Sequence, residues 1–173
     1  VTNYPLRESL INFTRGYIKS DKLKKKVMSL YENYPREVFL GNINLIGTSD
    51  TERILTVLDG NIRCLKIIVA LQFTIPGVPL IYYGDETGVT GGKDPDNRKS
   101  YPWENEDVDL IGFYKRIAQI RNGQDALKKG DFNIFDTEED IFAFERVYEN
   151  ERIVVVVNVS NAQKVVRGIT LEG

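Results

Sequence analysis

Apolar residues in the N-terminal part of the chain recur every three or four positions, which is the period of an amphipathic helix. One helix is predicted from Leu6 to about Gly16, a residue that suits a helix C-cap. A second is predicted over residues 20–34, because Ser20 is a favourable N-cap and Pro35 cannot continue a helix. The chain therefore begins with two amphipathic helices after a short extended start.

Two short apolar runs without alternation follow, at residues 43–46 and 78–83. Such runs are typical of parallel strands buried on both faces, although Pro79 is tolerated only near the beginning of a strand. A helix over residues 65–74 lies between them, and an extended start at residues 1–4 precedes them. Alternation of strands and helices predicts a parallel sheet.

The hydrophobic period changes towards the C-terminus. A long polar loop over residues 84–107 leads to a helix over residues 110–123. Antiparallel strands are then predicted over residues 132–135, 141–147 and 153–159, with a hairpin turn at residues 149–151. We therefore predict two domains, 1–124 and 125–173, in an α/β chain.

Charge and composition exclude several classes of function. The 23 basic and 25 acidic residues leave a net charge of −2, so we expect neither nucleic acid nor an anionic membrane as a partner. The single cysteine, Cys64, excludes an internal disulfide. The chain has no histidine, which removes the commonest general base and the commonest transition-metal ligand. We also expect no membrane span and no signal peptide. The compartment is left open.

A polar cluster at residues 47–53, Gly-Thr-Ser-Asp-Thr-Glu-Arg, follows the first apolar run and precedes a helix-like run from Ile54. In α/β enzymes the chemistry lies at the carboxyl ends of parallel strands. Asp50 is therefore a candidate catalytic carboxylate. The alternative is that Asp50 caps a helix beginning near Thr51.

This cluster resembles a signature of the α-amylase family of glycoside hydrolases, in which a His-Asp pair occupies the positions of Ser49 and Asp50. Four further segments resemble the family in the same order along the chain, at residues 2–5, 77–86, 94–98 and 126–130. The segment 94–98, with Trp103 nearby, is similar to the subgroup of neopullulanase, cyclomaltodextrinase and maltogenic amylase. The resemblance covers essentially the whole chain.

The resemblance implies a partial (β/α)₈ barrel, about strands six to eight with their helices, followed by a truncated antiparallel β domain. A whole barrel needs about 250 residues. The nucleophilic Asp and the acid/base Glu of the family follow strands four and five, so both would lie outside this chain. Retaining hydrolysis needs two carboxyl groups about 5 Å apart. We therefore expect a parent enzyme that cleaves α-glucosidic bonds in starch-derived or cyclic maltooligosaccharides, and an isolated chain that is inactive.

The resemblance also gives roles to individual residues. Asp50 would orient the reacting sugar and support the transition state, and Ser49 replaces a histidine that hydrogen-bonds that sugar. Asp94 and Arg98 would grip a glucose on the non-reducing side, although a surface ion pair or a turn at Asp94 remains open. No cofactor is implied. The partners expected are an α-glucan oligosaccharide and either the missing part of the barrel or a second copy, bound through exposed strand edges.

Other interpretations of the loops are less favoured. Asp85, Asp94 and Asp96 could suggest calcium, but their spacing does not match an EF-hand, and we expect no metal. The glycines at residues 88–92 lack the Gly-Lys-Ser/Thr of a phosphate-binding loop. Aromatic residues could stack on sugars, with Tyr82 and Tyr83 more in keeping with a core and Tyr101 and Trp103 open to either role. Two other functions compete with this interpretation. One is a non-catalytic carbohydrate-binding or assembly module, and the other is a nucleotide-binding domain.

Overall fold

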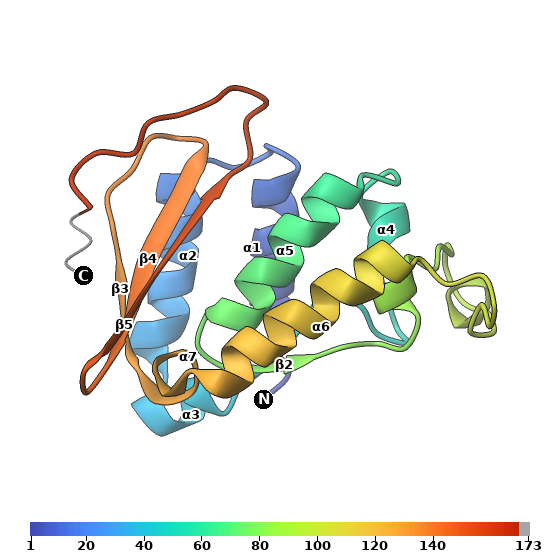
Figure 1. Ribbon diagram of the computed structural model, residues 1–173, viewed down its shortest axis with the longest axis horizontal. Coiled ribbons are helices and arrows are strands. Elements are labelled where there is room, and N and C mark those ends of the chain that lie inside the picture. The colour runs from blue at the N-terminus through green and yellow to red at the C-terminus, as the bar shows by residue number, and fades with distance from the viewer. Residues whose placement is uncertain (170–173) are drawn as a thin grey trace.

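The computed structural model describes residues 1–169 as an assembly of helices with two small sheets (Figure 1). The helices are α1 (Tyr4–Thr14), α2 (Ser20–Asn33), α3 (Arg36–Leu40), α4 (Ile54–Val57), α5 (Ile62–Thr74), α6 (Val108–Gly123) and α7 (Asp125–Lys129). The 3-10 turns are η1 (Asp85–Thr87) and η2 (Asp96–Arg98), and the strands are β1 (Ile43–Leu45), β2 (Val78–Leu80), β3 (Asp131–Ile134), β4 (Ile141–Tyr148) and β5 (Glu151–Asn158). Helices α1, α5 and α6 stand between the β3–β5 sheet and the loop that joins β2 to α6 (Figure 1).

The first sheet consists of β1 and β2, which pair in parallel with Ile43 opposite Val78. The two predicted parallel strands are therefore confirmed, although the second ends at Leu80 and not at Tyr83. The extended start is reduced to a single parallel bridge between Thr2 and Ile43.

Strand β2 is not buried on both faces, contrary to the sequence prediction. Val78 is 51% exposed and Leu80 is 39% exposed. Within residues 1–169 only β1 pairs with β2, so its other edge has no neighbouring strand. The apolar run therefore has the composition of a central strand but occupies an edge in this chain.

The second sheet is antiparallel in the order β3-β4-β5, as predicted. Strand β5 begins two residues earlier than expected, because Glu151 already pairs with Tyr148 across the hairpin. The turn between them is only two residues long, and Glu149 takes a positive φ of 51° to make it.

One hydrophobic cluster joins the second sheet to the helices that pack against it. It contains Leu10 and Phe13 from α1, Leu65 from α5 and Phe142 and Phe144 from β4. The rings of Phe13 and Phe142 meet edge to face with centroids 6.0 Å apart. The segments on either side of the predicted boundary thus share one core.

Two buried arginines, one from the second sheet and one from α6, bind backbone carbonyls at the end of α5 and in α7. Arg146 of β4 donates to the carbonyl oxygens of Thr74 (2.8 Å), Leu127 (3.0 Å) and Gly130 (3.1 Å). Arg121 of α6 donates to Phe73 at 2.7 Å and also to Leu127 and Gly77. Burial and, to a smaller extent, the charge of the neighbouring Arg121 together lower the pKa of Arg146 to about 9. These contacts satisfy carbonyls that a helix leaves free at its C-terminus.

Other differences from the sequence prediction are local. Helix α5 begins at Ile62, because the side chain of Asn61 accepts from the Cys64 amide and caps it. Helices α3 and α7 were not predicted, since five residues are too few to show a period. Tyr83 is 41% exposed and therefore not a core residue. No helix within residues 1–169 is long and apolar enough to cross a membrane.

Candidate functional site

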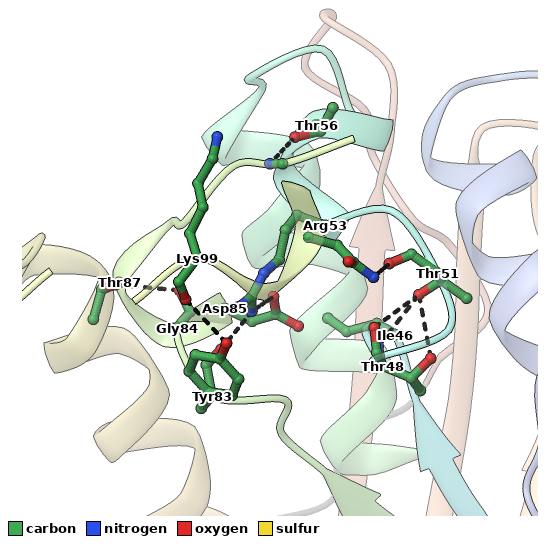
Figure 2. Close-up of polar contacts among 12 residues, drawn as sticks. Ile46, Thr48, Thr51, Arg53, Thr56, Tyr83, Gly84, Asp85, Thr87 and Lys99 are labelled. Atoms are coloured by element: carbon green, nitrogen blue, oxygen red, sulfur yellow. Dashed lines mark hydrogen bonds and ion pairs between the residues drawn. The ribbon is translucent and has the colours of Figure 1, made fainter. Parts of the chain in front are cut away.

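The polar cluster forms a turn directly after β1, held by its own threonines (Figure 2). Thr48 donates its backbone N–H to Thr51 Oγ1 at 3.3 Å, and its hydroxyl accepts from the Asp50 amide at 3.2 Å. The Asp50 carboxylate is left exposed on this turn. Asp50 is not a helix cap, because α4 begins at Ile54 with Arg53 at the N-cap position. The capping alternative is therefore wrong.

The structure brings all four sequence-predicted site residues together. Ser49 Oγ lies 3.4 Å from Asp50 Oδ1, and Arg98 Nη2 lies 3.4 Å from the carbonyl oxygen of Ser49. Arg98 Nε also pairs with Asp94 Oδ1 at 2.8 Å. The side chains of Asp94 and Arg98 are 64% and 52% exposed, so this pair is accessible to a ligand and contributes little to stability.

An ion pair that sequence reasoning missed lies beneath this turn. Arg53 and Asp85 are both fully buried, with Nη1 and Oδ1 3.3 Å apart (Figure 2). Arg53 also donates to the carbonyl oxygen of Tyr83, and its guanidinium carbon lies 4.2 Å from the ring centroid of Tyr82. In the sequence, this ion pair is indicated only by a basic residue three positions after Asp50 and an acidic residue just after the second apolar run.

Some polar atoms of this ion pair have no hydrogen-bond partner among the described residues. Burial raises the pKa of Asp85 to about 7, against the opposing effect of the Arg53 charge. Asp85 Oδ2 faces Gly47, where an added Cβ would lie 2.0 Å from that oxygen. Among residues 1–169, Asp85 Oδ2 and the Nε and Nη2 of Arg53 have no hydrogen-bond partner. Perturbed buried charges of this kind are common near functional sites.

The remaining candidates in the long loop divide into two groups. Trp103 is 74% exposed and its ring lies 4.5 Å from that of Tyr101, an arrangement that leaves an aromatic surface open to solvent. The three aspartates do not converge, because Asp85 faces Arg53, Asp94 faces Arg98 and Asp96 faces Lys99. Within residues 1–169 no group of three or more His, Cys, Asp or Glu side chains could hold a metal ion.

Comparisons with known proteins identify one family. The sequence matches the alpha-amylase catalytic domain over residues 4–126. The amylopullulanase of Thermoanaerobacter thermohydrosulfuricus is 37% identical over 202 aligned positions, which cover 95% of this chain and 14% of that protein. The cyclomaltodextrinase of Thermoanaerobacter pseudethanolicus is 36% identical over 176 positions, covering 100% of this chain and 31% of that protein. The chain thus spans less than a third of the length of either relative.

Solved structures give the same result. Cyclic alpha-maltosyl-(1→6)-maltose hydrolase from Arthrobacter globiformis matches with a TM-score of 0.88 and 32% identity, over 91% of this chain and 36% of that one. A cyclomaltodextrinase matches with a TM-score of 0.87 and 35% identity, over 91% of this chain and 28% of the other. The resemblance seen in the sequence is confirmed, and the chain belongs to the α-amylase family of glycoside hydrolases.

Proposed function

We propose that residues 1–124 form the last three βα units of a (β/α)₈ barrel and that residues 125–173 begin its C-terminal β domain. The chain is then part of a longer enzyme that hydrolyses α-glucosidic bonds in starch-derived or cyclic maltooligosaccharides with retention. The nucleophilic Asp and acid/base Glu are supplied from outside the chain. Relatives named amylopullulanase and cyclomaltodextrinase, which the chain covers only in part, support this proposal.

The meeting of two loops at the carboxyl ends of parallel strands carries the proposal. The turn after β1 presents Asp50, and the loop after β2 presents Asp94 and Arg98 beside it. An exposed carboxylate next to an arginine and a second carboxylate can hold sugar hydroxyls from several directions. In this proposal Asp50 supports the transition state and Asp94 with Arg98 positions a neighbouring glucose.

Ser49 supports a second candidate function. It stands where the family has a histidine, and its shorter hydroxyl lies against Asp50 at 3.4 Å. Serine donates a single hydrogen bond and carries no charge, so it makes a weaker contact with a sugar. A carbohydrate-binding module without turnover is therefore the second candidate.

Activity measurements separate these two functions. The 173-residue chain is expected to release no product from maltotriose, whereas a longer protein that includes the family's catalytic pair is expected to hydrolyse it. Asp50→Asn in the longer protein should lower kcat/KM by at least ~10²-fold, the scale of removing one preorganised electrostatic group. Asp136→Asn, in the loop between β3 and β4 and with a side chain that is 96% exposed, is the matched control. Binding without turnover would favour the second candidate, and indifference to Asp50→Asn would reject the site.

The free edge of β2 supports the partial-barrel proposal independently. Large apolar side chains are exposed along and beside this strand, at Val78, Leu80, Ile81 and Tyr83. Unpaired strand edges with apolar side chains readily pair with another chain. We expect the isolated chain to associate in sedimentation experiments and to become soluble and defined when the preceding barrel segment is supplied. A monomeric, cooperatively folded isolated chain would contradict this.

A further inference from the structure

The side chain of Asn97 joins the two loops of the candidate site. Asn97 is 1% exposed, and its Nδ2 donates to the carbonyl oxygens of Ser49 at 2.8 Å and Thr51 at 2.9 Å. These carbonyls stand immediately before and after Asp50. Asn97 Oδ1 has no partner among residues 1–169. Turning the amide over would therefore lose both hydrogen bonds and set three oxygens against one another, which fixes its orientation.

The loop that carries Asn97 has its own anchors. Arg53 donates its backbone N–H to the Gly91 carbonyl at 3.0 Å, and the Gly91 N–H donates to Thr56 Oγ1 at 2.8 Å. A Cβ at position 91 would lie 2.3 Å from the carbonyl oxygen of Asp96, so this tight fold of the loop requires glycine. Both hydrogen bonds of Gly91 are made with residues at the start of α4. Asn97 reaches the residues on both sides of Asp50.

Asp50 depends on its backbone for its position. Within residues 1–169 its carboxylate has one hydrogen-bonding contact, with Ser49 Oγ at 3.4 Å, and the rest of the group faces solvent. The point from which the Asp50 side chain projects is therefore set by the backbone between Ser49 and Thr51. Arg98 also reaches the Ser49 carbonyl, but at 3.4 Å and from an exposed side chain. Asn97 makes the two shorter contacts, and its own side chain is buried.

We propose that Asn97 is a positioning residue that holds the Asp50 carboxylate in a fixed relation to the Asp94–Arg98 pair. This inference rests on the proposed function, because it assumes that Asp50 acts on a sugar. Its two hydrogen bonds tie the turn after β1 to the loop after β2, so the group that supports the transition state and the groups that bind the neighbouring sugar move as one unit. A misplacement of about 1 Å in such an arrangement costs on the order of 10²-fold in rate.

The test uses the longer protein that carries the catalytic pair, with maltotriose as substrate. Asn97→Asp keeps the shape but removes both donors and sets a carboxylate against two carbonyls. Asn97→Ala removes the donors without adding charge, and serves if the Asp variant does not fold. Both should lower kcat by about 10²-fold with KM changed less than about threefold. Asn105→Asp, at an exposed asparagine of the same loop, is the control and should leave both constants unchanged.

Each outcome decides the inference. A loss in kcat for soluble, cooperatively melting Asn97→Ala supports a positioning role. An unchanged kcat in that variant overturns it, even if the melting temperature falls, because the side chain would then only stabilise the loop. A rise in KM alone also overturns it, since the effect would lie in sugar binding. Asp50→Asn is measured alongside, and its having no effect would reject the proposed function itself and with it the premise of this inference.

Discussion

Two regions of this chain bury an arginine, and the partners of the two guanidinium groups differ. At the junction with the second sheet, Arg146 faces peptide carbonyls from α5, α7 and the residue before β3. Beneath the polar turn, Arg53 faces a carboxylate, one carbonyl and two tyrosine rings. Among residues 1–169 both leave Nε without a partner, but only Arg53 also leaves Nη2 without one.

The comparison shows what each region is suited for. Carbonyls at a helix C-terminus carry partial negative charge and cannot change protonation state, so the contacts of Arg146 stay the same below its pKa of about 9. Asp85 can gain or lose a proton in the accessible range, because burial raises its pKa to about 7. The first region is a fixed structural junction. The second is a polar cluster in which some buried atoms have no hydrogen-bond partner. It lies next to the exposed candidate site residues, and functional sites are where such unpaired polar atoms are most often found.

The largest effect is expected at the fixed junction. Arg146→Met removes a charged donor from the carbonyls of Thr74 and Gly130, and hydrogen bonds to charged groups contribute roughly 1.5–3 kcal/mol each. The free energy of unfolding should fall by about 3–5 kcal/mol in urea titration. Arg116→Met, at an exposed position on α6, should change it by less than about 0.5 kcal/mol. Equal effects of the two changes would mean that the carbonyls find other partners.

A smaller effect is expected from Arg53→Met. The chain loses the hydrogen bonds to Tyr83 and Asp85, but Asp85 can then take up a proton and avoid an unpaired buried charge. We expect a loss of about 1.5–3 kcal/mol at pH 6, which grows as the pH rises because protonation becomes harder. A loss as large as that of Arg146→Met and independent of pH would remove the distinction between the two regions.

The smallest but most specific effect concerns pH. The folded-state pKa of Asp85 is about 7 and lies above the unfolded value of about 3.9. This group therefore contributes stability below about pH 4 that is lost as the pH rises through 7, with a slope approaching ~1.4 kcal/mol per pH unit. Asp85→Asn should remove that slope from unfolding curves measured between pH 4.5 and 8. Asp109→Asn, at an exposed acid of α6, should retain it. An unchanged slope in Asp85→Asn would show that Asp85 is ionised throughout.

Most of the regular structure could be predicted from the sequence, because long apolar periods identify an element by themselves. The period of α2 and the apolar run at the start of β4 each placed an element within a few residues of its observed position. The predicted burial of β2 on both faces was wrong. The run from Val78 has the composition of a doubly buried strand, yet this chain provides a neighbour on only one side. The composition of a strand indicates how buried it can become. Its actual burial also depends on whether the neighbouring strand is part of the same chain.

The candidate site was predictable to a different degree. Asp50, Asp94 and Arg98 were identified by resemblance, which needs only local sequence. Asn97 and the Arg53–Asp85 pair were missed, because their partners are more than 30 residues away in sequence. Asn97 lies in a loop where an asparagine also suits an ordinary turn. Its two carbonyl partners could be known only from the folded chain.

The edge-to-face contact of Phe13 with Phe142 has a consequence for anyone who divides this protein into pieces. A stop codon after residue 124 follows the change of period in the sequence, but it would remove the aromatic layer that covers α1 and α5 and leave the backbone carbonyls at the end of α5 without Arg146. The shortened product would expose the apolar face that the removed strands cover, in addition to the free edge of β2, and it would be more prone to aggregate. The change of sequence pattern is therefore a poor place to cut, and a shortened chain should keep the five strands found within residues 1–169.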